Sequence, residues 1–262
     1  KIYKAKIKPI IEKPAVKAAL KVPGLNNIIY SKIRKGLLEA FGGKVQEFVM
    51  GGAPLNPEVE KILKKIKFPY VVGYGMTEAC PLMSYEAWTK YVPGSCGKAI
   101  DMCEIRIDSD DPQNVVGEIQ ARGENITLGY YNNPEATANA FTEDGWLKTG
   151  DLGIMDAEGN IFIRGRSKNM ILGPSGQNIY PEEIEAVVNN QDYVVESVVV
   201  DRGGKLVALV FLDEQAIATA LLDAETKHSI PEKIRLSSNR QLPSFSQIHK
   251  VIVQDVPFEK TP

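Results

Sequence analysis

An acid, an arginine and a lysine stand in one glycine-containing stretch of the chain, residues 144–185. Asp151, Arg166 and Lys168 follow one another there. A carboxylate can accept hydrogen bonds from both hydroxyls of a ribose, and an arginine offers a planar fork of donors to ribose and phosphate oxygens. Any one of the three could be an ordinary turn or surface residue. Together and in this order, they favour a site that holds a sugar and a phosphate and then moves.

A second group of polar side chains follows a short strand that we predict at residues 70–72. Tyr74, Thr77 and Glu78 stand there within five residues. A tyrosine ring can stack on a base, a threonine hydroxyl can donate to a phosphate oxygen, and a glutamate can ligate Mg²⁺, which prefers oxygen ligands. Thr77 followed by an acid is also a good helix start, so a capping role stays open, and both roles are compatible.

A glycine pair forms a third candidate element. We predict a helix at residues 28–41 and a buried strand at residues 45–50, and this strand runs into the sequence GGAP at positions 51–54. Glycines after a strand permit close approach of the backbone to a ligand. The alternative is a plain strand-to-helix turn, because Asn56 can cap a helix that begins at Pro57.

These motifs resemble those of the adenylate-forming superfamily, which contains acyl-CoA synthetases, luciferases and the adenylation domains of peptide synthetases. The resemblance is carried by GGAP at 51–54, YGMTE at 74–78, WLKTGD at 146–151, GRSK at 165–168 and NIYPEEIE at 178–185. It is greatest toward the long-chain fatty acid:CoA ligases. It covers nearly the whole of this chain, but only the later half of a full family member.

The resemblance implies a role for each candidate residue. Thr77 would contact the α-phosphate, Glu78 would hold magnesium, and Lys168 would be the hinge between two domains, and these three form the expected catalytic set. Tyr74 would stack on adenine, and Asp151 would bind the ribose. The expected nucleotide and coenzyme A contacts are Gly52, Ala53, Pro54, Tyr74, Gly75, Met76, Asp151, Ile163, Arg166, Ser175 and Gly176.

The implied activity is the AMP-forming ligation of a fatty acid, expected to be long-chain, to coenzyme A through an acyl-adenylate. Its substrates would be the carboxylate, ATP with Mg²⁺, and coenzyme A. Another adenylate-forming enzyme with a carrier-protein or luciferase-type acceptor stays open as an alternative. A non-catalytic AMP-binding module, and a structural fragment that binds nothing, stay open as well.

The expected fold class combines α/β and α+β architecture. Residues 1–167 would be the C-terminal part of a large ATP- and acyl-binding domain with a mixed sheet, helices and β-hairpins. Residues 168–262 would be a small, mobile α+β domain after the hinge. In this second part we predict a helix from Pro181, a β-hairpin at 197–212, a helix at 214–227 and a strand at 251–253.

Two elements of the family have no match in this chain. The phosphate-binding loop, rich in Ser, Thr and Gly, would stand before residue 1. The C-terminal catalytic lysine would stand a few residues after Pro262, so Lys260, which precedes that proline, does not take its role. The sequence therefore predicts that the 262-residue chain is inactive alone.

Composition excludes several other classes of protein. The chain is 44% hydrophobic and 24% charged, as is ordinary for a soluble globular protein. A net charge of −2 gives no electrostatic ground for a nucleic-acid partner. No transmembrane segment, secretory signal or CxxC pair is visible, so we expect a cytoplasmic protein with free cysteines. The lysine-rich residues 1–24 leave peripheral membrane contact open, and the oligomeric state is open too.

Overall fold

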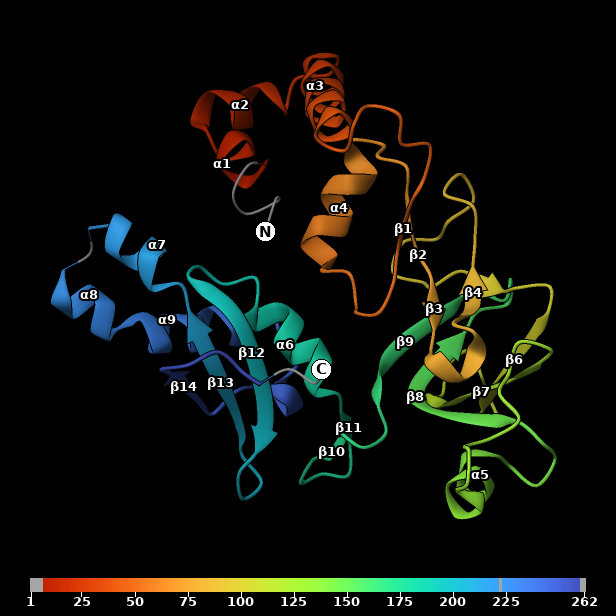
Figure 1. The fold of residues 1–262 in the computed structure, drawn as a ribbon. Helices are drawn as coiled ribbons and strands as arrows, with labels where there is room; N and C mark the ends of the chain where they lie inside the picture. Colours follow the sequence, from red (N-terminus) through yellow and green to blue (C-terminus); the bar gives the residue numbers. More distant parts are fainter. Residues whose placement is uncertain (1–6, 222, 260–262) are drawn as a thin grey trace. The chain divides into compact units, whose positions relative to one another are not determined.

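The computed structural model describes residues 7–221 and 223–259 (Figure 1). The chain divides into two compact units. Unit 1 comprises Lys1–Arg106, Gln120–Thr149 and Met155–Phe162, and unit 2 comprises Ile107–Ile119, Gly150–Ile154 and Ile163–Pro262. Lys168 lies inside the last segment of unit 2, Ile163–Pro262. The domains 1–167 and 168–262, with Lys168 as the hinge between them, stay a prediction.

Two of the N-terminal lysines, Lys8 and Lys17, lie on two separate short helices. Helix α1 spans Lys8–Ile11, and α2 spans Pro14–Ala19. The second helix begins at a proline because Lys13, the residue before it, has extended backbone. Lys1, Lys4 and Lys6 lie outside the described residues. Every helix in the described part of the chain is too short or too polar to cross a lipid bilayer.

A β–α–β arrangement in unit 1 positions two of the candidate loops. Strand β1 (Phe48–Met50) is followed by α4 (Pro57–Lys65) and by β2 (Tyr70–Val72), which pairs with β1 in parallel. The side chain of Asn56 accepts hydrogen bonds from two amides at the start of α4, which confirms the predicted cap. Because the two strands are parallel, residues 51–54 and 73–78 both leave the same edge of this pair.

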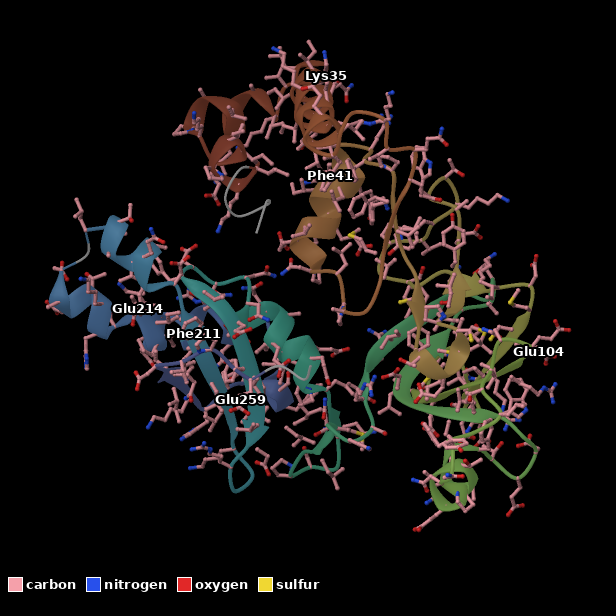
Figure 2. The ribbon with its side chains drawn as sticks, in the orientation of Figure 1. Lys35, Phe41, Glu104, Phe211, Glu214 and Glu259 are labelled. Carbon is pink, nitrogen blue, oxygen red and sulfur yellow. The ribbon has the colours of Figure 1, made fainter. Side chains whose placement is uncertain are left out.

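Aromatic side chains build the core beneath these strands. Helix α3 (Leu25–Ala40) ends beside Phe41, which Figure 2 labels, and the rings of Phe41 and Phe48 lie 4.9 Å apart. Phe68 completes this cluster, and its side chain is buried. The aromatic contacts hold α3 against β1, so the strand that leads into residues 51–54 rests on a packed core.

Two further sheets follow along the chain. Strands β3 (Tyr74–Gly75), β4 (Leu82–Tyr85) and β5 (Lys98–Ala99) form an antiparallel sheet. Strands β6 (Cys103–Asp108), β7 (Gly117–Gly123), β8 (Leu147–Met155) and β9 (Ile161–Arg166) form a four-stranded sheet in this order, and α5 (Pro134–Ala140) lies between β7 and β8 in sequence.

The remainder of unit 2 is built around a three-stranded sheet. The hairpin β10 (Ile171–Leu172) and β11 (Asn178–Ile179) leads into α6 (Pro181–Val188). Strand β13 (Leu206–Leu212) pairs antiparallel with β12 (Val194–Asp201) and parallel with β14 (Lys250–Gln254). Helix α6 packs on β12, and α9 (Ile230–Asn239) packs on β14. The expected α/β and α+β fold class is confirmed; that residues 168–262 move as a domain stays a prediction.

The prediction of one continuous helix at residues 214–227 is wrong. The structure has α7 (Glu214–Thr219) and α8 (Ala224–His228) instead. Leu221 adopts a positive φ of 50°, which no helix continues through, and Asp223 then caps α8 through its side chain. The prediction also omitted α9, whose buried face repeats every four residues at Ile230, Ile234 and Ser238.

The packing of α9 gives a test of this part of the fold. Ile234 is 3% exposed in the core of unit 2, whereas Leu236 on the same helix is 46% exposed. We expect Ile234→Ala to lower the free energy of unfolding by about 2–5 kcal/mol, because it removes buried methyl groups and leaves a cavity. Leu236→Ala should cost less than about 1 kcal/mol. Urea unfolding followed by circular dichroism compares the two, and equal losses would show that α9 does not pack as described.

Candidate functional site

The loop at residues 51–54 presents its backbone to solvent. Gly52, Ala53 and Pro54 are all exposed, and Gly52 has a φ of +80°, a conformation that favours glycine. A Cβ on Gly51 would lie 3.4 Å from the carbonyl oxygen of Gly73. The loop therefore runs close beside the backbone that follows β2, as the parallel pairing requires.

The second candidate segment turns sharply after β3. Gly75 has no room for a side chain, because a Cβ there would lie 1.8 Å from the carbonyl oxygen of Pro81. Thr77–Ala79 then form a short 3₁₀ helix, η2. Met76, the residue before this helix, has extended backbone. Thr77 is exposed and Glu78 is half-buried, so both side chains reach the surface at the same turn.

Tyr74 lies deeper than a base-stacking role suggests. Tyr74 is only 7% exposed, and it lies opposite Ser84 where β3 pairs with β4. The predicted stacking on adenine would have to use the small part of the ring that solvent reaches. This role stays a prediction.

Glu78 has a partner that the sequence reasoning missed. The Tyr130 hydroxyl donates a hydrogen bond of 2.8 Å to the Glu78 carboxylate. This bond, together with partial burial and the negative charge of Glu78, raises the pKa of the Tyr130 phenol. In the sequence GYYNNPEAT at 129–137, neither residue type nor spacing indicates this contact.

Asp151 and Arg166, two of the candidate nucleotide contacts, come together in unit 2. The Arg166 Nε atom lies 2.9 Å from a carboxylate oxygen of Asp151. Asp151 lies within β8 and is 6% exposed, whereas Arg166 ends β9 and is exposed. The structure thus excludes a simple turn role for Asp151. An inner acid beside an outer guanidinium can present acceptors and donors to one polar ligand.

The segment after Arg166 is a turn fastened at both ends. Ser167 donates its amide to the carbonyl of Gly150, and the Asn169 side chain donates 2.7 Å to a carboxylate oxygen of Glu182 in α6. Lys168, the predicted hinge, is exposed between them. A Cβ on Gly165 would lie 2.6 Å from the second carboxylate oxygen of Glu182, so only glycine fits there without a shift.

The remaining predicted contacts lie on β9 and on the hairpin that follows. Ile163 is a half-buried residue of β9. Ser175 and Gly176 are exposed in the turn between β10 and β11, where Gly176 has a φ of +82°. This turn is closed by the amide of Gly173, which donates 2.8 Å to the carbonyl of Gln177. Its exposure permits contact with a ligand, and the contact with coenzyme A stays a prediction.

The donor set around Glu78 can be compared with the needs of Mg²⁺. No cluster of three or more His, Cys, Asp or Glu side chains that could hold a metal occurs within residues 7–221 and 223–259. Protein-bound Mg²⁺ commonly uses one or two carboxylates together with substrate phosphates and water. A single half-buried carboxylate at a surface turn fits such a shared ion and does not fit a metal held by protein ligands alone.

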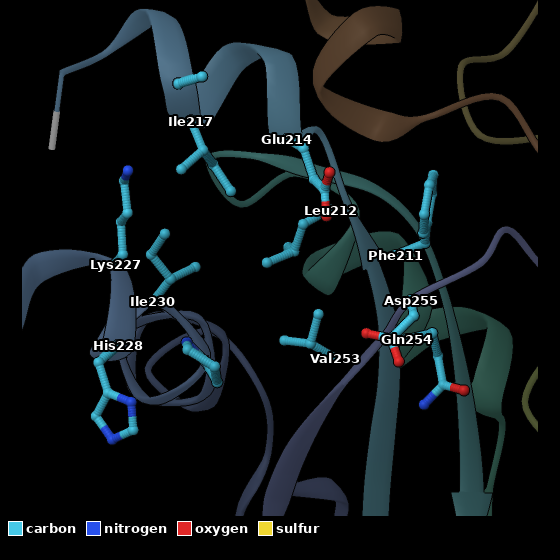
Figure 3. Close-up of a pocket in the computed structure, with 12 residues that line it drawn as sticks. Phe211, Leu212, Glu214, Ile217, Lys227, His228, Ile230, Val253, Gln254 and Asp255 are labelled. Atoms are coloured by element: carbon cyan, nitrogen blue, oxygen red, sulfur yellow. The ribbon is translucent and has the colours of Figure 1, made fainter. Parts of the chain in front are cut away.

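A cavity of ≈ 510 Å³ in unit 2 is separate from these residues (Figure 3). It lies among the end of β13, α7, the α8–α9 junction and the end of β14. Its lining mixes aliphatic and charged side chains, which include Leu212, Ile217, Ile230, Val253, Glu214 and Lys227. None of its lining residues is a predicted site residue, so the cavity adds nothing to the candidate nucleotide site.

The family described as AMP-binding enzyme matches residues 4–131. Long-chain-fatty-acid–CoA ligase 1 of Saccharomyces cerevisiae is 32% identical over 183 residues, which are 67% of this chain and 26% of that protein. The 2-succinylbenzoate–CoA ligase of Listeria innocua is 37% identical over 199 residues, which are 71% of this chain and 40% of that protein. The chain thus spans less than half the length of these two curated relatives.

Solved structures give the same answer for the fold. ATP-bound MatB from Rhodopseudomonas palustris superposes with a TM-score of 0.69 at 29% identity, over 90% of this chain and 47% of that one. The O-succinylbenzoate coenzyme A synthetase MenE from Bacillus subtilis, in complex with ATP and a magnesium ion, gives 0.66 at 27% identity, over 84% and 46%. The motifs, the folded elements that carry them and these similarities together show that the chain belongs to the adenylate-forming superfamily.

Proposed function

We propose that this chain forms part of an AMP-forming ligase that joins a long-chain fatty acid to coenzyme A through an acyl-adenylate. The observation that carries the proposal is the pairing of Asp151 with Arg166 on the β8–β9 hairpin, at 2.9 Å. The nucleotides bound by the similar structures support ATP as a substrate. The yeast relative supports a long-chain acid, whereas the Listeria relative acts on an aromatic acid, so the acid class is the part of the proposal that most needs a test.

The reaction has two steps. An oxygen of the substrate carboxylate attacks the α-phosphorus of ATP, and pyrophosphate leaves with the electrons of the broken P–O bond. The sulfur of coenzyme A then attacks the acyl carbon, and AMP leaves with the former carboxylate oxygen. Both steps pass through anionic transition states, which donors and cations stabilise.

The residues of this chain would bind and orient the nucleotide. Asp151 would accept hydrogen bonds from the ribose hydroxyls, and Arg166 would donate to ribose and phosphate oxygens. Thr77 would donate its hydroxyl to the α-phosphate, and Glu78 would be a ligand of the Mg²⁺ that accompanies ATP. When bound, that ion supplies positive charge to the phosphate oxygens.

Four further contacts follow from the same proposal. The backbone of Gly52–Pro54 would lie along the adenine, near the acyl pocket, and Tyr74–Met76 and Ile163 would complete the adenine site. Ser175 and Gly176 would face the coenzyme A. Lys168 would be the hinge about which residues 168–262 change pose between the two steps, since a loop can absorb the change of φ and ψ that such a motion needs.

The reaction is tested by exchange of labelled pyrophosphate into ATP over a panel of carboxylic acids from short to long. The assay uses the polypeptide that carries these residues together with its flanking sequence. We expect exchange that is fastest with long-chain fatty acids and that requires Mg²⁺. The 262-residue chain, which covers less than half of its relatives, is expected to give none.

Each other outcome of this assay selects a different function. Exchange with an aromatic or short acid alone would change the proposed class of acid substrate and would still support a ligase. Exchange without thioester formation when coenzyme A is added would point to a carrier-protein or luciferase-type acceptor. AMP binding with no exchange for any acid would leave a non-catalytic AMP-binding module, and no binding at all would leave a structural fragment.

The role of Asp151 gives a second prediction. Asp151→Asn replaces a charged acceptor with a neutral amide, and we expect it to raise the Kd for AMP about 10- to 100-fold. Asp201→Asn is the matched control, because Asp201 is an exposed acid on β12. Calorimetric titration with AMP measures both, after circular dichroism has confirmed that each variant is folded. An unchanged Kd in Asp151→Asn would remove Asp151 from the ribose site.

A further inference from the structure

One segment of the chain, Asn125–Tyr130, fastens the turn that carries Glu78. The side-chain amide of Asn125 donates hydrogen bonds to the backbone carbonyls of Ala79 and Leu82, at 3.0 and 2.9 Å. The Thr127 backbone amide donates 2.7 Å to the carbonyl of Glu78. With the hydroxyl of Tyr130 on the Glu78 carboxylate, every one of these bonds has its donor in one segment and its acceptor in the other.

The donor segment is itself held in place by α5. The Thr137 hydroxyl accepts a 2.9 Å hydrogen bond from the amide of Tyr130 and donates to the carbonyl of Asn133. Gly129 has a φ of +142°, and a Cβ there would lie 2.5 Å from the Thr137 side chain. This position of Tyr130 therefore depends on glycine before it and on a hydroxyl seven residues after it.

The hydrogen bond from Tyr130 restricts the Glu78 side chain but leaves acceptor positions on its carboxylate open. The hydroxyl reaches one carboxylate oxygen at 2.8 Å. A carboxylate has two oxygens with about four acceptor positions, so acceptor positions remain for a cation. A long side chain at a surface turn otherwise samples several rotamers, and holding one of them reduces the entropy lost when an ion binds.

We propose that Tyr130 is a positioning residue for Glu78, whose carboxylate it holds in the rotamer that ligates the Mg²⁺ of Mg·ATP. The inference rests on the proposed function for the identity of the ligand. It goes beyond that function because it assigns a role to a residue outside the proposed nucleotide and acid contacts. Tyr130 acts through Glu78, so it is not a catalytic residue.

The chain offers a matched pair of variants for the test. Tyr130→Phe removes only the hydroxyl that donates to Glu78. Tyr131→Phe makes the same chemical change one residue later, on a side chain that is 94% exposed. The full polypeptide that carries these residues is used for both variants.

The first measurement is cation binding, independent of activity. Mn²⁺ is titrated into each protein with saturating ATP, and bound Mn²⁺ is followed by electron paramagnetic resonance. We expect Tyr130→Phe to weaken Mn²⁺ binding about five- to tenfold, which corresponds to the net contribution of an ordinary hydrogen bond. Tyr131→Phe should bind like the wild type. In the pyrophosphate exchange, the half-saturating Mg²⁺ concentration should rise by the same factor in Tyr130→Phe, with the KM for the carboxylate unchanged.

A double variant separates positioning from a general structural role. If Tyr130 acts through Glu78, adding Tyr130→Phe to Glu78→Gln should change Mn²⁺ binding no further. Equal Mn²⁺ binding by the wild type and Tyr130→Phe would overturn the inference, as would a fall in thermal stability with a uniform loss of every kinetic constant. Failure of the wild type to bind Mn²⁺ with ATP would overturn it too. Absence of exchange with every acid, with the predicted Mn²⁺ pattern intact, would overturn the proposed reaction alone.

Discussion

A carboxylate that is buried on folding loses hydrogen bonds to water and needs protein donors to replace them. Both acids of the candidate site meet this constraint. Glu78 is met by the hydroxyl of Tyr130, and Asp151 is met by the guanidinium of Arg166. In each case the acid and its partner come from different segments of one unit. The charges that would face a ribose or a metal are therefore fixed by the fold before any ligand arrives, which is the condition for binding without a large loss of entropy.

The glycines of the motifs serve this arrangement by allowing close approach. At Gly75, Gly129 and Gly165, an added Cβ would collide with neighbouring atoms at 1.8, 2.5 and 2.6 Å. Each of the three stands beside a segment that carries a candidate side chain or its support. The neighbour is backbone at Gly75 and a side chain at Gly129 and Gly165, so the turn after Gly75 is the most tightly restricted of the three.

Features that depend only on neighbouring residues, such as helix caps, were predicted well from the sequence. The Asn56 cap followed from residue types alone, because an asparagine before a proline is a typical helix start. The sequence indicated that Asp151 and Arg166 serve one sugar- and phosphate-binding site, but it did not predict that the two side chains pair with each other. Tyr130 and Glu78 are 52 residues apart, and nothing in either segment encodes their contact. The break between α7 and α8 was missed because helix-forming residues flank the positive φ of Leu221.

The central claim is that a carboxylate oxygen becomes bonded to the α-phosphorus of ATP. It is tested most directly by supplying the full polypeptide with ATP, coenzyme A and a long-chain fatty acid labelled with ¹⁸O in its carboxylate. Mass spectrometry of the products should find one labelled oxygen in AMP, because that oxygen leaves with AMP when the sulfur takes the acyl carbon. Unlabelled AMP, or label in inorganic phosphate, would contradict an acyl-adenylate and with it the proposed function.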